Sequence, residues 1–200
     1  MLATYPPCSW EKAHRIILKL FPWKPLPELP LGGRLCHFVD QWEKLTHDPR
    51  ILNSVRGWEI PLLSKPKGKK NLKQYPMSQE EKDLVSLEVA SMLEKGAICV
   101  VNPNPDQFLS NIFLRRKKDG SNRPIINLKG LNNHIKYEKF KMETLKDLKH
   151  LLRQGDLMVK IDLKDAYFTV PLAKSSRKYV RFPWEGNLHE FNGCHIADVE

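Results

Sequence analysis

Two aspartates stand three residues apart beside an aromatic pair, in the heptapeptide Asp162-Leu163-Lys164-Asp165-Ala166-Tyr167-Phe168. Asp162 lies near the end of an alternating apolar run over residues 157–163, which predicts a strand with one buried face. A carboxylate at a strand end suits Mg²⁺, which takes one or two carboxylates together with waters and substrate phosphates. Two-metal phosphoryl transfer uses such carboxylates to hold ions about 3.5–4 Å apart. In the alternative interpretation, Asp162 faces solvent and Asp165 caps a turn; the spacing alone leaves both open.

A basic hairpin is predicted upstream of this strand. Two apolar runs within residues 112–128 flank Asp119-Gly120, a pair typical of a tight β-hairpin turn. Five cations surround the turn: Arg115, Arg116, Lys117, Lys118 and Arg123. Guanidinium forks and ammonium groups suit phosphate oxygens. The hairpin and the acidic strand end together indicate nucleotidyl transfer, whereas an exposed basic turn without a ligand is the alternative.

The distribution of charge along the chain also indicates a polyanionic partner. Lys and Arg number 33 against 23 acidic residues, and +8 of the net +10 falls within residues 111–160. Such clustering favours a nucleic-acid partner, with a solvated basic face as the alternative.

Other patterns in the sequence argue against four classes of protein. The four cysteines show no Cys-x-x-Cys spacing, which argues against a zinc site and a disulfide framework. No apolar run approaches the roughly 20 residues of a membrane helix. The N-terminus lacks the charged start and apolar run of a signal peptide. We therefore expect an intracellular protein, cytoplasmic or nuclear, that is neither secreted nor bound to a membrane.

The first half of the chain divides by composition. Six of the fifteen prolines lie in the first thirty residues, which predicts an extended arm with one short amphipathic helix over residues 10–20. Apolar residues at helical spacing follow over residues 35–45, and Asp48-Pro49 predicts the start of another helix. A lysine-rich linker covers residues 65–73.

The elements nearest the two charged groups are predicted in more detail. Ser78 and Glu81 form a capping box at the start of a helix that ends at Gly96. Its apolar stripe is Leu84, Val85, Val89, Met92 and Leu93. A strand over 97–101, a helix over 143–153 and a second hairpin with strands 179–183 and 188–191 complete the expected elements.

Two of these segments resemble a known family. Residues 162–172 (DLKDAYFTVPL), with Arg177-Lys178-Tyr179 and Phe182, resemble the first catalytic palm motif of reverse transcriptases, and residues 113–127 resemble their fingers hairpin. Upstream segments are similar to the polyproteins of DIRS-type retrotransposons, elements that also encode a tyrosine recombinase: Gly32 to Leu35, Trp42, Leu45 to Pro49, Gly57 to Pro61, and Leu93 to Ala97. The resemblance covers residues 31–193.

The resemblance implies an α+β fold, namely the fingers and the start of the palm of a right-hand polymerase. An irregular Pro-rich extension precedes them. The expected parts are a Pro-rich arm (1–31), a helical extension with a basic linker (32–76) and a reverse transcriptase fragment (77–200). The implied reaction is attack of a primer 3′-hydroxyl on a deoxynucleoside triphosphate, templated by RNA, with Mg²⁺ or Mn²⁺ as cofactor. The implied partners are an RNA template, a DNA primer and deoxynucleoside triphosphates.

The resemblance also assigns roles to single residues. Asp162 is implied as a catalytic metal ligand together with the carbonyl of Leu163, and Tyr167 as the steric gate against the ribose 2′-hydroxyl. Backbone N–H groups of Asp165 and Ala166 are implied to bind the triphosphate. Lys117 and Arg123 are implied to bind the β- and γ-phosphates. Lys118 is the alternative to Lys117, because the hairpin is one residue shorter than in retroviral enzymes. The implied nucleic-acid contacts are Arg115, Arg116 and Lys118.

The chain departs from the family after residue 193. It continues with Cys194 to Glu200 where the family has Leu-Pro-Phe-Gly, and it contains no Tyr-x-Asp-Asp. We therefore expect an incomplete two-ion site and no polymerisation by these 200 residues alone. The alternatives are a catalytically dead, nucleic-acid-binding remnant of such an element and, less favoured, an interaction module that uses the Pro-rich arm. The sequence predicts no oligomeric state.

Overall fold

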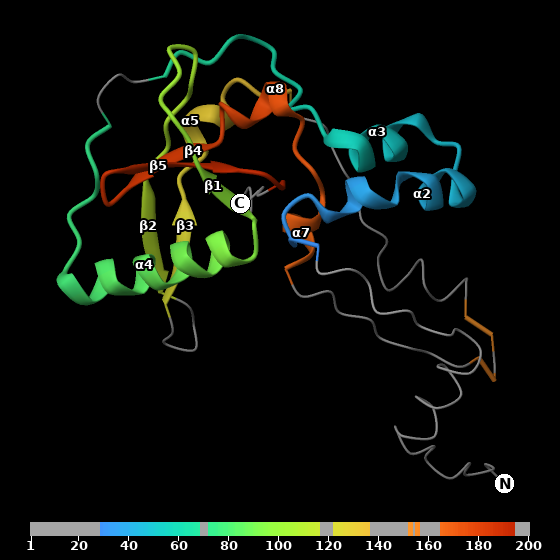
Figure 1. Ribbon diagram of the computed structural model, residues 1–200, viewed down its shortest axis with the longest axis horizontal. Coiled ribbons are helices and arrows are strands. Elements are labelled where there is room, and N and C mark those ends of the chain that lie inside the picture. Colours follow the sequence, from blue (N-terminus) through green and yellow to red (C-terminus); the bar gives the residue numbers. More distant parts are fainter. Residues whose placement is uncertain are drawn as a thin grey trace, which may run out of the picture.

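The computed structural model describes residues 29–68, 72–116, 122–136, 152–153, 155–156 and 165–194 (Figure 1). The helices are η1 (Arg34–Phe38), α2 (Val39–Leu45), α3 (Pro49–Gly57), α4 (Gln79–Glu94), α5 (Lys129–Asn132), α7 (Ala166–Thr169) and α8 (Lys174–Arg177). The strands are β1 (Ile98–Val100), β2 (Ile112–Arg116), β3 (Asn122–Ile126), β4 (Arg181–Trp184) and β5 (Asn187–Phe191). They form an antiparallel three-stranded sheet in the order β1-β5-β4 and a β2–β3 hairpin. None of the helices described is long and apolar enough to cross a membrane.

Helix α4 begins and ends as its sequence predicts. The Ser78 hydroxyl accepts a hydrogen bond from the Glu81 N–H at 3.2 Å, and the Glu81 carboxylate accepts one from the Ser78 N–H at 2.8 Å, which confirms the capping box. Gly96 follows the helix with a φ of 64°, the predicted left-handed cap. The buried stripe is narrower than predicted, because Leu84 and Leu93 remain 40% and 38% exposed.

The helices before α4 match their predicted starts but bury little. Asp48 caps α3 by accepting from the Arg50 N–H at 2.8 Å, with Pro49 at the first helical position, as predicted. The predicted helix over 35–45 is divided into the 3₁₀ turn η1 and the α-helix α2. Neither element has a buried residue, and Leu45 is 77% exposed.

Both predicted hairpins are present. In β2–β3, Ile112 pairs with Ile126, and the turn between the strands lies outside the described residues. The second hairpin is shifted from its predicted bounds, because β4 begins at Arg181 and residues 178–180 form a turn. Its connection is only Glu185–Gly186, with φ of 46° and 79°, and two positive φ values are typical of a type I′ turn.

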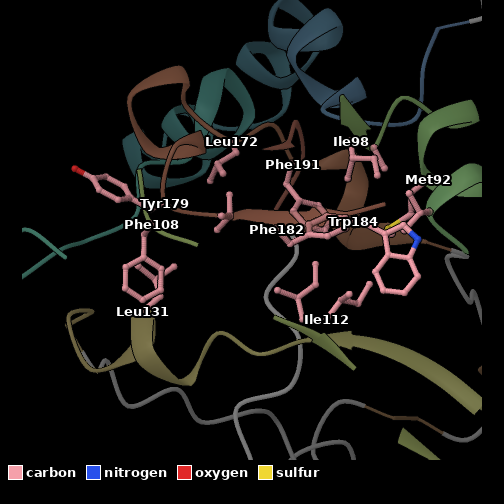
Figure 2. Close-up of a cluster of buried hydrophobic side chains, with 14 of the residues drawn as sticks. Met92, Ile98, Phe108, Ile112, Leu131, Leu172, Tyr179, Phe182, Trp184 and Phe191 are labelled. Carbon is pink, nitrogen blue, oxygen red and sulfur yellow. The ribbon is translucent and has the colours of Figure 1, made fainter. Parts of the chain in front are cut away.

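One apolar core joins the sheet, the hairpin and α4. Phe182 and Phe191 are 0% and 1% exposed and their ring centroids lie 5.7 Å apart. Figure 2 shows them at the centre of the cluster, among side chains from β1, β2 and α4, with Leu131, Phe108 and Tyr179 at one end. Burial of large aromatic rings at such a junction is the main stabilising contribution in a small domain.

The segment before α4 lies against the segment after residue 165. The Trp58 N–H donates to the Pro171 carbonyl at 2.8 Å, and the Ala173 N–H donates to the Trp58 carbonyl at 2.9 Å. Ile60 enters the core, and its N–H donates to the Ser176 hydroxyl at 3.0 Å. Contacts therefore cross the predicted boundary at residue 76, and the division of the chain itself stays a prediction.

Several predicted elements fall outside the described residues. They are most of the Pro-rich arm, including the helix over 10–20, the strand over 157–163 and, apart from residues 152 and 153, the helix over 143–153.

A pH dependence follows from His189 in β5. The imidazole is buried, stacks on Phe182 at a centroid distance of 5.1 Å, and has its pKa lowered by burial. Because the folded state holds it neutral, its contribution to stability is complete above the unfolded pKa of about 6.5 and is lost as the pH falls toward the lowered folded value. The slope from one such group reaches at most about 1.4 kcal/mol per pH unit. In urea unfolding between pH 7.5 and 5, His189→Phe is expected to lose less stability than the native protein.

His47→Phe is the matched control, because His47 is exposed. Equal acid sensitivity of the native protein and His189→Phe would show that His189 is not the titrating group.

Candidate functional site

The described part of the predicted catalytic motif is a tight turn at the start of α7. Asp165 has φ 55° and ψ 29°, in the left-handed region. Its carbonyl accepts from the Phe168 N–H at 3.1 Å. A left-handed residue followed by a helical one aims successive N–H groups to the same side, an arrangement that binds anions. The backbone of Asp165 and Ala166 therefore has a conformation suited to phosphate oxygens.

The Asp165 side chain points to a different partner. It makes no capping hydrogen bond to α7, and its Oδ2 accepts from Nζ of Lys95 at 3.0 Å. Lys95 stands 70 residues earlier, at the end of α4. The alternative that the Asp165 side chain caps its own turn is therefore wrong, and the carboxylate is engaged in an ion pair.

Of the two aromatic residues in the motif, Phe168 packs against the core and Tyr167 faces solvent. The Phe168 ring stacks on Phe191 with a centroid distance of 6.5 Å and an interplanar angle of 11°. Tyr167 is 67% exposed. Because the core does not use its ring, Tyr167 is free to contact a ligand next to the Asp165 turn.

Close packing of backbone against backbone fixes this turn in the fold. A Cβ on Gly193 would lie 2.1 Å from the Phe168 carbonyl oxygen, and one on Gly32 would lie 1.9 Å from that of Gly96. The Gly33 N–H donates to the same Phe168 carbonyl at 2.7 Å. We call these four glycines, residues 32, 33, 96 and 193, the glycine crossing.

Asn192 binds the crossing to the sheet. Its Nδ2 donates to the Gly96 carbonyl at 3.0 Å, and its Oδ1 accepts from Arg177 Nη1 at 2.9 Å. Its backbone N–H donates to the Ala97 carbonyl, and its own carbonyl accepts from the Leu172 N–H, both at 2.9 Å. Neither Lys95 nor Asn192 is given a role by the sequence patterns described above. The only sequence signal for Asn192 is a polar residue directly before a glycine at the end of a strand.

The basic hairpin is formed but stands apart from this turn. Arg115 is exposed and pairs in register with Arg123 across β2–β3, as Arg116 does with Asn122. The side chains of Arg116 and Arg123, and all of Lys117 and Lys118, lie outside the described residues. Figure 1 shows the hairpin crossing the middle of α4, whereas α7 lies beyond the C-terminal end of that helix. The described strands of the hairpin and the Asp165 turn therefore lie at different parts of α4.

The predicted metal ligands are not covered by the structure. Asp162 and Leu163 lie outside the described residues, so their roles stay predictions. Within the described ranges, no three His, Cys, Asp or Glu side chains gather as a metal site would require.

The chain was compared with protein-family models and with solved structures. No protein-family model matches the chain. The native prototype foamy virus protease-reverse transcriptase superposes with a TM-score of 0.53 at 15% identity, covering 70% of this chain and 18% of that one. The foamy viral protease-reverse transcriptase in complex with dsDNA superposes with a TM-score of 0.53 at 16% identity, covering 93% and 32%. This chain has a reverse-transcriptase-like fold. It spans less than a third of the length of either viral protein, and the DIRS-type assignment stays a prediction.

The glycine crossing predicts a steric requirement at Gly193. Gly193→Ala is expected to lower the free energy of unfolding by about 3 kcal/mol, because the new methyl group would meet the Phe168 carbonyl, a backbone atom that cannot turn away. Urea unfolding followed by tryptophan fluorescence measures the change.

Gly186→Ala is the control. Gly186 has a φ of 79°, but no atom lies within 4 Å of the place that a Cβ would take, so the substitution should cost only the strain of about 1–2 kcal/mol for a left-handed alanine. A loss at Gly193 no larger than at Gly186 would contradict the steric account.

Proposed function

We propose that the chain is the fingers and first palm segment of an RNA-directed DNA polymerase encoded by a DIRS-type retrotransposon. The observation that supports the proposal is the Asp165–Tyr167 turn, which combines a left-handed backbone conformation suited to an anion with an exposed ring, within a reverse-transcriptase-like fold. In this proposal, the N–H groups of Asp165 and Ala166 bind the triphosphate of an incoming deoxynucleotide. Tyr167 lies beneath its sugar and excludes a 2′-hydroxyl.

The fingers hairpin supplies the cations. Lys117 or Lys118, together with Arg123, bind the β- and γ-phosphates, while Arg115 and Arg116 contact template or primer phosphates. Guanidinium groups form paired hydrogen bonds to phosphate oxygens, which fixes orientation as well as charge.

The residues assigned to the metal fit Mg²⁺ or Mn²⁺ in their chemistry. A carboxylate from Asp162 and a carbonyl from Leu163 are hard oxygen donors of the kind these ions prefer. When bound, the ions neutralise the phosphates and lower the pKa of the primer hydroxyl. Asp165 is not a third ligand in this proposal, because its carboxylate is paired with Lys95.

A second candidate is a nucleic-acid-binding remnant without catalysis, because these 200 residues contain no Tyr-x-Asp-Asp motif that would add carboxylates to Asp162. Only one acid of the Asp-x-x-Asp pair is left for a metal, and one carboxylate holds two divalent ions poorly against their mutual repulsion. Primer extension on an RNA template, with Mg²⁺ or Mn²⁺, separates the candidates. Extension that is abolished by Asp162→Asn supports the polymerase, and duplex binding without extension by any longer form of the protein supports the remnant.

Nucleic-acid binding should depend steeply on salt. With four to six phosphate contacts, the logarithm of the association constant should fall against the logarithm of salt concentration with a slope of about −3 to −5. Arg123→Ala and Lys117→Ala should each flatten this slope by up to about one unit, because each removes one phosphate contact. Fluorescence anisotropy with a labelled RNA–DNA duplex measures the slopes.

Lys44→Ala, at the end of α2, serves as the control for loss of a distant charge. An affinity that does not change with salt, or an equal effect of Lys44→Ala, would contradict a binding site on the hairpin.

Sugar selectivity tests the role of Tyr167. In a longer protein that includes a Tyr-x-Asp-Asp hairpin, Tyr167→Val should raise ribonucleotide incorporation relative to deoxynucleotide by at least about tenfold, because the smaller side chain leaves room for the 2′-hydroxyl. Tyr167→Phe keeps the ring and should keep the selectivity. Single-nucleotide extension with each substrate gives the ratio, and unchanged discrimination in Tyr167→Val would place the gate at another residue.

A further inference from the structure

The ion pair between Lys95 and Asp165 joins the end of α4 to the turn of the candidate site. Lys95 Nζ donates to Asp165 Oδ2 at 3.0 Å, and the two side chains are 31% and 27% exposed. A pair sheltered to this extent is screened by salt less than a fully exposed one.

The backbone of Lys95 is fixed independently of this pair. Its N–H donates to the Ser91 carbonyl at 3.0 Å, and its own carbonyl accepts from the N–H groups of Leu31 at 2.7 Å and Gly32 at 3.3 Å. Its ammonium therefore extends from a rigid point beside the glycine crossing, and less conformational freedom is lost when the pair forms.

Asp165, in contrast, adopts a conformation that needs support. A φ of 55° is uncommon for any residue with a Cβ, although aspartate tolerates it better than most. The α7 N–H groups do not hold its carboxylate. The carboxylate is held instead by Lys95, so the ion pair and the left-handed turn are coupled.

We propose that Lys95 is a positioning residue for a nucleoside triphosphate. By binding the Asp165 carboxylate, it keeps the turn in the conformation that aims the backbone N–H groups of Asp165 and Ala166 at the phosphates. Its ammonium is engaged by the carboxylate and does not itself contact the ligand. This inference rests on the proposed function and identifies the contact that prepares its phosphate site.

The experiment uses the ¹⁵N-labelled 200-residue chain, with the backbone amides of Asp165 and Ala166 followed by NMR. Inorganic tripolyphosphate is the probe. Lys95→Met, which keeps the length of the side chain, is expected to raise the dissociation constant about fivefold, the equivalent of about 1 kcal/mol. Lys95→Arg keeps the positive charge and should leave the dissociation constant within about twofold of the native value. Lys82→Met removes the same charge near the other end of α4, about 20 Å away by helical rise, and should change affinity less than twofold.

A second background separates positioning from direct phosphate binding. Asp165→Gly removes the carboxylate and lets residue 165 adopt a positive φ without strain. If Lys95 positions the turn, Lys95→Met has less effect in the Asp165→Gly background than in the native one. If Lys95 binds phosphate directly, the effect is as large or larger, because its ammonium is then unpaired, and that outcome overturns the proposal.

The free protein gives a readout that does not need the ligand. Lys95→Met should shift the amide signals of residues 165–167 and speed their hydrogen exchange, whereas Lys82→Met should not. If Lys95→Met leaves the amide signals and the hydrogen exchange of residues 165–167 unchanged, the positioning role is overturned, whether or not tripolyphosphate binds. If Lys95→Met shifts these signals but the native chain does not bind tripolyphosphate, Lys95 positions the turn and the proposed nucleotide site is overturned. If Lys95→Met fails to fold, Lys95→Gln, which keeps a hydrogen-bond donor, replaces it in both measurements.

Discussion

The position of the candidate site depends on backbones that approach more closely than any side chain would allow. The chain passes Gly96 at Gly32 and passes Phe168 at Gly193, and at both places a Cβ would lie about 2 Å from a carbonyl oxygen. Hydrogen bonds and the core then act on segments that are already in contact. These approaches set how closely the segment after residue 165 lies to the end of α4.

Polar contacts convert this close packing into a defined geometry. Asn192 connects the end of β5 with the start of β1 and with Arg177, and Lys95 connects α4 with Asp165. Each is partly sheltered from water, where an unpaired polar group is costly and a satisfied one specifies a single arrangement. The turn that carries Tyr167 is therefore set by residues distant in sequence. A mutation at Lys95 or Asn192 would therefore change the geometry of the turn, although neither residue contacts the ligand in this proposal.

Local signals in the sequence predicted much of the described fold. The capping box at Ser78, the cap at Asp48, the left-handed Gly96 and the two hairpins each follow from side-chain chemistry within a few residues, and each is confirmed. Bounds that depend on packing were less accurate: β4 starts at Arg181, and the apolar stripe of α4 is narrower than its residues suggest.

The candidate site was predictable only in part. The motif around Asp165 could be found because its residues are contiguous. Its exposed Tyr167 agrees with a functional role, and its partly buried Phe168, which stacks on Phe191, agrees with a structural one. Lys95 could not be found, because the pair joins residues 70 positions apart and no local pattern marks it. The sequence also joined the basic hairpin with the acidic motif through charge alone. The structure describes the strands of the hairpin and the Asp165 turn, and a ligand shared by the two groups stays a prediction.

Photo-cross-linking tests the central claim, that the Asp165–Tyr167 turn binds the phosphates of a nucleotide. A deoxynucleoside triphosphate with an aryl azide on its γ-phosphate would be irradiated with the protein and an RNA–DNA primer-template, and the labelled peptides identified by mass spectrometry. The account predicts label on residues 165–172 and on the β2–β3 hairpin, increased by the primer-template and competed by unmodified triphosphate. Label confined to η1, α2 and α3, or unaffected by competitor, would contradict it.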